Sequence, residues 1–321
     1  MNFKNKNILV TGADGFIGSW IAKRLVDEGA HVHSIVRDIK KESNIDILGL
    51  RKSVTVISGD LVDPNICQRT FNEYEIELCF HIAAQAIVAT ANNSPISTFK
   101  SNIEGTWNLM EAARLSKYIK GMIVASSDKA YGVQKELPYT EESPLLGLYP
   151  YDASKACTDI LARSYHKTYG IPVAVTRNAN TYGGADMNFS RLIPYTIKTT
   201  LDGEIPLIRS DGTPERDYMY IKDAVDAYLA LSSNISRKEV QGEAFNFGIG
   251  MPVSVLQLYE EILKLMNKKI KPKILGEAKN EIDRQFLSIE KVKRVLKWQP
   301  KYTLKEGLKE TIDWYTKYLA K

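Results

Sequence analysis

Short apolar runs alternate with amphipathic stretches through the first half of the chain. Runs typical of strands cover residues 7–11, 31–36, 54–58, 78–82, 121–126 and 172–177. Between them, apolar residues recur at helical spacing, first from Phe16 to Leu25 and later in residues 97–118 and 151–169. Apolar strands separated by helices predict a parallel sheet covered on both faces, so the expected fold class is α/β, doubly wound.

The alternation changes beyond residue 177. Residues 178–184 are expected to form a polar loop, residues 223–232 a helix and residues 244–247 a short strand. Residues 254–266 and 305–317 are predicted amphipathic helices, the first with Ser254 as its N-cap. We expect a smaller, partly interleaved α/β lobe toward the C-terminus. Open α/β sheets bind ligands beyond the carboxyl ends of their strands, so a lobe placed there would close a cleft.

Composition and charge exclude several classes of protein. The 321 residues are 44% hydrophobic and 25% charged, which excludes disordered and fibrous chains. The 43 Lys and Arg residues exceed the 38 Asp and Glu by five and are scattered among them, so no nucleic-acid partner is expected. Uninterrupted apolar runs stay well short of the roughly 20 residues that span a bilayer, which predicts no membrane segment.

Cysteine and histidine usage points to the cytosol and away from metals. The three cysteines are dispersed, as in proteins of a reducing compartment, and the chain runs from Met1 directly into an apolar run without room for a signal peptide. We therefore expect a cytoplasmic protein. Among four histidines only His31 and His33 stand two residues apart, so no metal site is expected.

A glycine triplet joins the first predicted strand to the first helix. Gly12, Gly15 and Gly18 have GxxGxxG spacing, with Phe16 and Ile17 at the start of the helix. Glycines there let the backbone turn tightly and approach a pyrophosphate, whose charge lies at the helix N-terminus. The strand–turn–helix context predicts a dinucleotide site, against the alternative of a glycine-rich turn with no ligand.

Residues after the second and third strands bear on which dinucleotide binds. Arg37 follows the second strand, where an arginine can pair with a 2′-phosphate, so NADP is slightly favoured. Asp38 is the next residue, and an acid there keeps NAD open. Asp60, followed by Leu61, comes after the third strand and is expected at the adenine edge. The alternatives are a solvated turn for Arg37 and a helix cap for Asp60.

Three side chains predict an acid–base centre. Tyr151 and Lys155 lie one turn apart on one face of a predicted helix. A neighbouring ammonium is expected to lower the pKa of a phenol, which would make Tyr151 a usable general base. Ser127, at the end of the strand predicted for residues 121–126, is placed to hydrogen-bond the same substrate oxygen. The YxxxK spacing alone is common and mostly structural, whereas its combination with the glycine triplet is far more specific.

The sequence resembles the extended short-chain dehydrogenase/reductases that act on nucleotide sugars, over almost its whole length. The resemblance rests on the glycine triplet, His81-Ile82-Ala83-Ala84-Gln85, Asn102 with Gly105-Thr106, residues 126–132, Tyr151 and Lys155, residues 177–183, Arg216-Asp217-Tyr218, Arg284 and Leu296-Lys297-Trp298-Gln299-Pro300. It implies a Rossmann-type NAD(P)-binding domain over residues 1–176, to which the chain returns near residues 220–250. Residues 177–219 and 251–321 would form the nucleotide-sugar lobe, and homodimers would form through the helices of residues 97–118 and 151–169.

The same resemblance implies contacts for the ligands. Ala83 and Ala84 would contact the cofactor. Gln85, Asn180, Arg191, Arg216 and Arg284 would contact the nucleotide sugar, with arginine forks suited to phosphate oxygens. Each arginine could instead be a surface ion-pair residue.

The residues beside Ser127 indicate the subfamily. Asp128 and Lys129 follow it, as in CDP-glucose 4,6-dehydratases, which carry a Ser/Thr-Asp-Lys segment. Residues 215–220 look more like dTDP-glucose dehydratases and epimerases, so the nucleobase stays open. The resemblance implies that Tyr151 removes the C4 hydroxyl proton, that Asp128 protonates the departing C6 hydroxyl, and that a base removes the C5 proton.

Lys129 could be that base only when neutral, which requires desolvation or a cationic neighbour. A turn or cap residue for Asp128 and a carboxylate-paired lysine for Lys129 are the structural alternatives. The functional alternatives to a 4,6-dehydratase are a nucleotide-sugar 4-epimerase using Ser127, Tyr151 and Lys155, and a non-catalytic dinucleotide-binding regulator.

Overall fold

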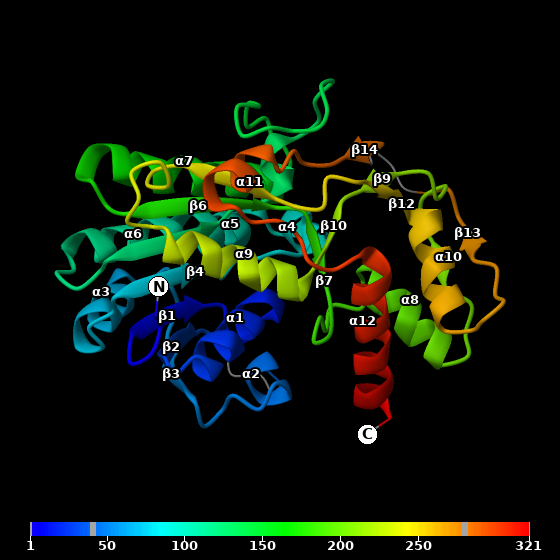
Figure 1. The fold of residues 1–321 in the computed structure, drawn as a ribbon, viewed down its shortest axis with the longest axis horizontal. Helices are drawn as coiled ribbons and strands as arrows, with labels where there is room; N and C mark the ends of the chain where they lie inside the picture. Colours follow the sequence, from blue (N-terminus) through cyan, green and yellow to red (C-terminus); the bar gives the residue numbers. More distant parts are fainter. Residues whose placement is uncertain (1, 39–42, 278–281, 321) are drawn as a thin grey trace.

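The computed structural model describes residues 2–38, 43–277 and 282–320 (Figure 1). A seven-stranded sheet lies at its centre, in the order β3-β2-β1-β4-β5-β6-β11, with every neighbouring pair parallel. Its strands are β1 (Asn7–Thr11), β2 (His31–Val36), β3 (Val54–Ser58), β4 (Leu78–His81), β5 (Gly121–Ala125), β6 (Val173–Asn178) and β11 (Ala244–Phe247). The predicted α/β, doubly wound Rossmann-type fold is confirmed.

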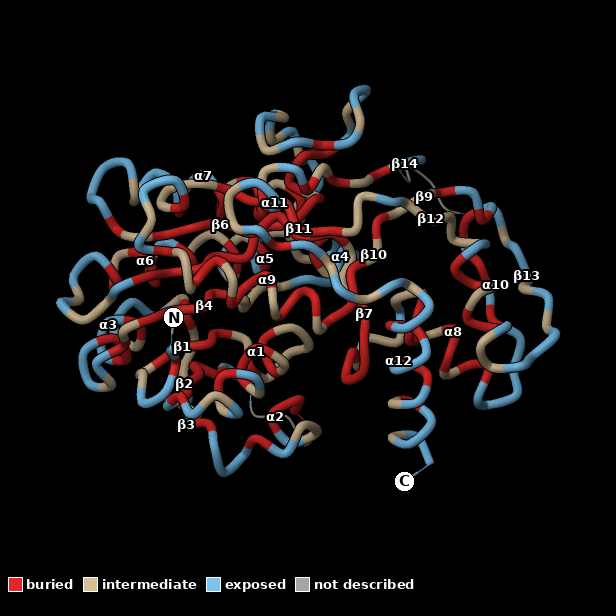
Figure 2. Tube along the Cα trace, viewed as in Figure 1, coloured by how far each residue is buried: buried red, intermediate tan, exposed pale blue. Residues whose placement is uncertain are grey.

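Helices cover both faces of this sheet. One face packs against α1 (Phe16–Asp27), α2 (Asn44–Ile47) and α9 (Ile221–Ser233). The other face packs against α3 (Pro64–Glu73), α6 (Gly105–Leu115) and α7 (Pro150–Tyr169). Alternate strand residues serve the two cores, because side chains in a strand point to opposite faces: Ile8 and Val10 lie in the first core and Leu9 in the second. In Figure 2 most of the central strands are drawn as buried segments, whereas many of the connecting loops are exposed.

Elements from the second half of the chain form a smaller lobe at the right of Figure 1. Its helices are α8 (Leu192–Leu201), α10 (Val255–Leu265) and α12 (Leu304–Leu319), whereas α11 (Glu290–Leu296) lies beside β11 of the large sheet. Its short strands pair as β7 (Asn180–Tyr182) with β10 (Tyr218–Tyr220), β8 (Leu207–Ile208) with β13 (Lys273–Ile274), and β12 (Val253–Ser254) with β9 (Glu215–Arg216) and β14 (Arg284–Gln285). Ser254 caps α10 as predicted, in a capping box with Gln257.

Two sequence predictions differ from the structure. Residues 178–184 were expected to form a loop, but three of them form β7, because β10 supplies parallel backbone partners from 38 residues further along the chain. The helix expected over residues 97–118 consists of α5 (Pro95–Phe99), a π-helical segment η1 (Lys100–Glu104) and α6, which ends at Leu115. A further short helix, α4 (Val88–Asn93), precedes α5.

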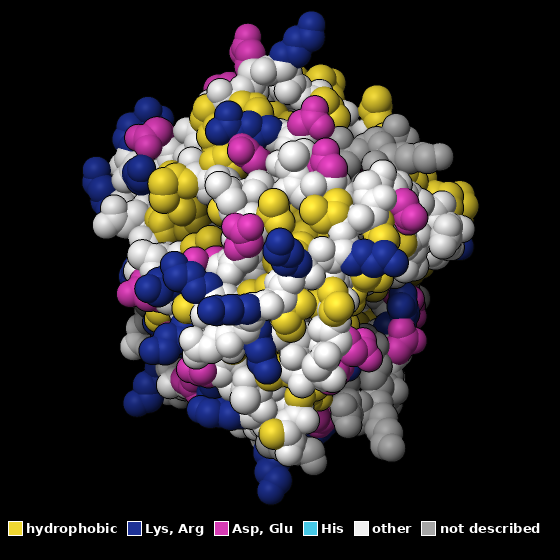
Figure 3. All heavy atoms as spheres, turned by 90° about the vertical axis from the view of Figure 1, so that its right-hand side faces the viewer, with side chains coloured by type: hydrophobic (Ala, Val, Ile, Leu, Met, Phe, Trp, Pro, Cys, Tyr) yellow, Lys and Arg dark blue, Asp and Glu magenta, His cyan; other side chains and the backbone are white. Residues whose placement is uncertain are grey.

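The face at the right of Figure 1 carries mixed charge. Figure 3 shows Lys and Arg side chains interspersed with Asp and Glu across this face. Among the described residues, no helix is long and apolar enough to cross a membrane. The same part of the chain holds no group of three His, Cys, Asp or Glu side chains suited to a metal ion. His33 is buried and packs its ring 4.7 Å from that of Tyr74.

Candidate active site

The turn between β1 and α1 is shaped for close backbone approach. Gly12 has φ +73°, and a Cβ there would lie 2.9 Å from the Ala83 backbone at the end of β4. A Cβ on Gly18 would collide with the Gly12 carbonyl oxygen. Gly15 is the N-cap of α1, whose first residues are Phe16 and Ile17. The turn lies at the switch point of strand order between β1 and β4, where doubly wound folds bind nucleotides. A pyrophosphate on the N-terminus of α1 therefore fits these residues.

Arg37 does not present a free guanidinium. Its Nε donates to Asp38 Oδ2 at 2.8 Å, and its Nη1 lies 4.0 Å from Asp60 Oδ2. The hydrogen bond to Asp38 raises the pKa of Arg37. Asp60 also accepts from the Val62 backbone, and Asp63, not Asp60, caps α3. Leu61, the residue after Asp60, is buried.

Buried side chains fasten the loop after β4 to the site. His81 bridges Thr11 Oγ1 and Thr106 Oγ1, at 2.9 Å each, and burial lowers its pKa to about 3. Asn102, in the π-helical segment, donates to Ser154 Oγ at 2.9 Å and bonds both the N–H and the C=O of Gln85. The Gln85 side chain turns back to the Ile87 N–H. π-helical segments recur at functional sites, and here one places an amide where it joins α7 to this loop.

A cavity of about 910 Å³ opens at the carboxyl ends of the central strands. The sequence-predicted residues that line it are Ile17, Ala84, Ser127, Asp128, Lys129, Tyr151, Lys155, Asn180, Arg191 and Arg216. Of the predicted substrate residues, Gln85 and Arg284, both in the described part of the chain, do not line this cavity. The structure therefore brings the predicted catalytic set and three of the five predicted substrate residues around one cavity.

Ser127, Asp128 and Lys129 form a connected group at the end of β5. Ser127 caps the 3-10 helix η2 (Asp128–Tyr131), and its Oγ donates to Asp128 Oδ1 at 3.0 Å. Lys129 Nζ donates to Asp128 Oδ1 and Oδ2 at 3.2 and 3.1 Å. It also donates to Gln285 Oε1 at 2.6 Å. The carboxylate-paired lysine weighed above is thus what the structure contains, and neither of these neighbours is the cation that would favour neutral Lys129.

The electrostatics of Tyr151 differ from the sequence prediction. Burial raises its pKa to about 12, only partly offset by a hydrogen bond with Ser127. Lys155 Nζ donates to the Ala125 carbonyl at 2.7 Å, and burial lowers the pKa of Lys155 to about 8. The expected lowering of the Tyr151 pKa by Lys155 is therefore not found, because burial outweighs the other influences on the phenol.

Asp152 is a buried carboxyl that sequence analysis did not single out. Burial raises its pKa to about 6, with Lys129 lowering it and Asp128 raising it. The folded state therefore binds a proton that the unfolded chain has released, and stability is lost as the pH rises from about 4 through 6. We expect Asp152→Asn to stabilise the protein at pH 8 by up to about 3 kcal/mol and to have little effect near pH 4. Denaturant unfolding at both pH values tests this, with exposed Asp313→Asn as the control; equal effects at the two pH values would contradict it.

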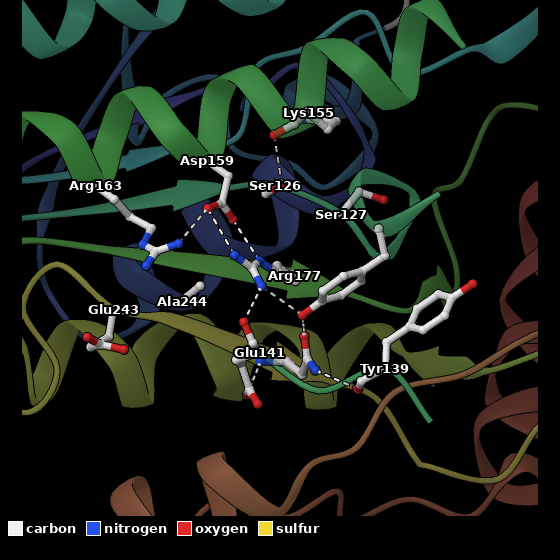
Figure 4. Close-up of polar contacts among 12 residues, drawn as sticks. Ser126, Ser127, Tyr139, Glu141, Lys155, Asp159, Arg163, Arg177, Glu243 and Ala244 are labelled. Atoms are coloured by element: carbon white, nitrogen blue, oxygen red, sulfur yellow. Dashed lines mark hydrogen bonds and ion pairs between the residues drawn. The ribbon is translucent and has the colours of Figure 1, made fainter. Parts of the chain in front are cut away.

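A buried ion pair supports the far end of η2. Arg177 binds Asp159 through Nε and Nη2, at 2.8 and 3.1 Å, and both residues are at most 1% exposed. Arg177 Nη1 also donates to Tyr131 Oη and to the Glu141 carbonyl. Figure 4 shows the guanidinium between α7 and the segment that holds Tyr139 and Glu141. The network therefore connects β6, α7 and η2, which carries Asp128 and Lys129.

The predicted phosphate-binding arginines lie in different surroundings. Arg191 Nη1 pairs with buried Asp186 Oδ2 at 2.9 Å. Arg216 lines the cavity and donates from Nη1 to the Glu215 carbonyl. Arg284 is exposed and pairs with Glu215 Oε2 at 2.7 Å. Arg191 and Arg284 therefore form ion pairs in the structure, which was the alternative to a phosphate-binding role.

A family model described as GDP-mannose 4,6 dehydratase matches residues 9–311. The chain belongs to this family. It is 32% identical to the trifunctional UDP-glucose 4,6-dehydratase/UDP-4-keto-6-deoxy-D-glucose 3,5-epimerase/UDP-4-keto-L-rhamnose-reductase RHM1 of Arabidopsis thaliana. That match covers 98% of this chain and 48% of the relative, so the chain spans about half the length of that protein.

Solved structures of both activities resemble the fold. UDP-glucose 4-epimerase of Thermotoga maritima, with UDP-glucose, superposes with a TM-score of 0.89 at 30% identity, covering 98% of this chain and 99% of that chain. dTDP-glucose 4,6-dehydratase of Bacillus anthracis, in complex with NAD, superposes with a TM-score of 0.84 at 28% identity, covering 97% of each chain. The predicted membership in the nucleotide-sugar epimerase/dehydratase family is therefore confirmed, and the comparisons leave the reaction and substrate within it open.

Proposed function

We propose that the protein is a nucleotide-sugar 4,6-dehydratase, which converts an NDP-hexose into an NDP-4-keto-6-deoxyhexose and water. The observation that carries this proposal is the Asp128–Lys129 pair, which lines the same cavity as Ser127, Tyr151 and Lys155. A 4-epimerase, the alternative, needs a Ser/Tyr/Lys set but neither a buried acid nor a basic group beside it. Asp128 is 2% exposed and pairs with Lys129, so an acid and a basic group lie together beside the Ser/Tyr/Lys set.

The residues around the cavity have separate roles in the proposed reaction. Bound nicotinamide dinucleotide supplies a hydride acceptor for C4 and a hydride donor for C6. Tyr151, with Ser127 against it and Lys155 one helical turn away, takes the C4 hydroxyl proton. The resulting ketone acidifies the C5 proton, which Lys129 removes in its neutral form, and Asp128 protonates the departing C6 hydroxyl. General acid–base steps of this kind contribute about 100- to 10,000-fold each.

The nucleobase proposal rests on sequence alone. The Ser127-Asp128-Lys129 segment resembles CDP-glucose 4,6-dehydratases, so CDP-glucose is the substrate that we favour. Asn180, Arg191 and Arg216 line the cavity and are proposed to bind the diphosphate and sugar. Arg284 can join them only by giving up its contact with Glu215.

The proposed reaction is tested by mass spectrometry of the purified protein incubated with CDP-, dTDP-, UDP- and GDP-hexoses, without added reductant. We expect one nucleotide sugar to give a product lighter by one water, which would identify the base as well as the reaction. A product of unchanged mass and new chromatographic mobility would instead identify an epimerase and leave Asp128 and Lys129 as binding residues.

For the cofactor we propose NAD rather than the slightly favoured NADP. The Asp38 and Asp60 carboxylates already flank Arg37, so a 2′-phosphate would meet negative charge there. We expect wild-type protein to bind NAD+ more tightly than NADP+. Asp38→Ser should strengthen NADP+ binding about tenfold, because Arg37 is released to pair with the phosphate. Calorimetric titration of both dinucleotides tests this, and tighter binding of NADP+ by the wild type would contradict it.

We propose a homodimer formed through α6 and α7, which pack against each other. Both helices expose large apolar side chains: Trp107 and Leu115 on α6, and Ile160 and Tyr169 on α7. We expect light scattering to give twice the 36.1 kDa protomer mass for the wild type and the protomer mass for Ile160→Glu. Leu319→Glu, on α12, is the control. A wild-type protomer mass at micromolar concentration would contradict the proposal.

A further inference from the structure

Gln285 lies fully buried where the smaller lobe meets the catalytic segment. It is the second residue of β14, which pairs with β9. Alternation along the strand sends neighbouring side chains to opposite sides: Arg284 is exposed, whereas Gln285 is 0% exposed. Nothing in the local sequence distinguishes this glutamine from a surface residue.

Both ends of the Gln285 amide contact the proposed acid–base pair. Oε1 accepts from Lys129 Nζ at 2.6 Å, and Nε2 donates to the Asp128 backbone carbonyl at 3.0 Å. The reversed amide would place donor against donor and acceptor against acceptor, so these partners establish which atom is which. A single buried side chain thus contacts both residues of the pair.

We propose that Gln285 is a positioning residue that keeps Lys129 Nζ against the Asp128 carboxylate throughout the elimination. This inference rests on the proposed dehydratase function. A lysine side chain is long and flexible, and Asp128 attracts it strongly only while Lys129 is an ammonium. An amide oxygen accepts from an ammonium and from a neutral amine alike, and it adds no charge that would hold the proton on Lys129.

The proton changes balance around this pair. Transfer of one proton from Lys129 to Asp128 gives a neutral amine and a carboxylic acid, the forms that base and acid require. Lys129 then takes the C5 proton while Asp128 protonates the C6 oxygen and the C–O bond breaks, which restores ammonium and carboxylate. Lys129 returns its proton to C5 when C6 is reduced. Tyr151 still holds the C4 hydroxyl proton, and its transfer to Asp128 through Ser127 Oγ, 3.0 Å from Asp128 Oδ1, regenerates the amine–carboxylic acid pair for the next cycle.

The backbone of Gln285 connects this geometry to the lobe. Its carbonyl accepts from Asp217 N at 3.2 Å, and the buried Asp217 carboxylate accepts from the backbone N–H groups of Ile249 and Gly250. The residue that holds Lys129 is therefore anchored to several lobe segments and follows directly after Arg284. The position of Lys129 consequently depends on the position of the lobe relative to the central sheet.

The test uses Gln285→Leu and Gln285→Glu in the full-length protein, with exposed Gln299→Leu as the matched control. Water loss is followed by mass spectrometry across pH, and oxidation at C4 by nicotinamide absorbance, with the nucleotide hexose that the wild type converts. We expect Gln285→Leu to slow water loss about 10- to 100-fold while KM and C4 oxidation stay within about threefold. Gln285→Glu keeps the shape but adds a carboxylate that favours the ammonium form of Lys129 over proton transfer to Asp128, so water loss should slow about tenfold while C4 oxidation is retained.

The outcomes separate this inference from the function on which it rests. A wild type that forms no lighter product from any hexose overturns the proposed function and the role of Gln285 with it. Wild-type dehydration with unchanged rates and pH profiles in both variants overturns the positioning role alone, as does a loss shared equally by KM, C4 oxidation and water loss. If Gln285→Leu fails to fold, the nearly isosteric Gln285→Glu still decides through its rate of water loss relative to C4 oxidation.

Discussion

Replacing Asp128 by Asn is expected to slow water loss from the nucleotide sugar by at least about 100-fold, while oxidation at C4 continues. Asparagine has the size of aspartate and can still accept the hydrogen bonds from Ser127 and Lys129 at Oδ1. It cannot deliver a proton to the C6 hydroxyl. The elimination therefore loses its acid, whereas the Tyr151 step at C4 keeps its residues.

The measurement combines mass spectrometry of the product with nicotinamide absorbance for C4 oxidation. We expect reduced cofactor and a 4-keto sugar that retains its C6 hydroxyl to accumulate in the variant. The exposed Asp313→Asn variant controls for a general effect of losing one carboxylate. If Asp128→Asn leaves turnover unchanged and the product has the mass of the substrate, the protein is an epimerase and Asp128 serves to bind.

The second large effect is on stability: Arg177→Met should lower the free energy of unfolding by about 3–5 kcal/mol. The substitution leaves the Asp159 carboxylate buried at 0% exposure without its bidentate partner. Arg163, exposed and 3.6 Å from Asp159 Oδ1, compensates only weakly. Figure 4 shows how many segments converge on the lost guanidinium, including the one with Glu141.

Urea unfolding of Arg177→Met and of the double variant Arg177→Met/Asp159→Leu tests this account. The double variant removes both charges together and should recover most of the lost stability, because no unpaired charge stays buried. If the double variant is as unstable as Arg177→Met, the loss comes from packing around β6 and not from the stranded carboxylate. We also expect Arg177→Met to slow water loss, since Tyr131 ends the 3-10 helix that carries Asp128 and Lys129.

The long elements could be predicted from the sequence because local patterns specify them. The strands at residues 7–11, 31–36 and 54–58 match the prediction residue for residue, since each is a short run rich in β-branched residues. The two- and three-residue strands of the lobe could not be found this way. β7, β9 and β14 exist because distant segments supply their backbone partners, and a run that short has no periodicity of its own.

The features of the site also fall into those set by local sequence and those set by distant partners. Residue types and spacing determined by themselves the α/β class, the glycine turn of Gly12, the Tyr151–Lys155 helix face and the Ser127-Asp128-Lys129 segment, because each is a property of neighbours along the chain. Only the tertiary structure decided that Asp60 Oδ2 lies 4.0 Å from Arg37 Nη1, that burial raises the pKa of Tyr151, and that Gln285 reaches Lys129 across 156 residues. Charge pairing, desolvation and buried hydrogen bonds depend on which segments meet in space, and that is set by packing of the whole chain.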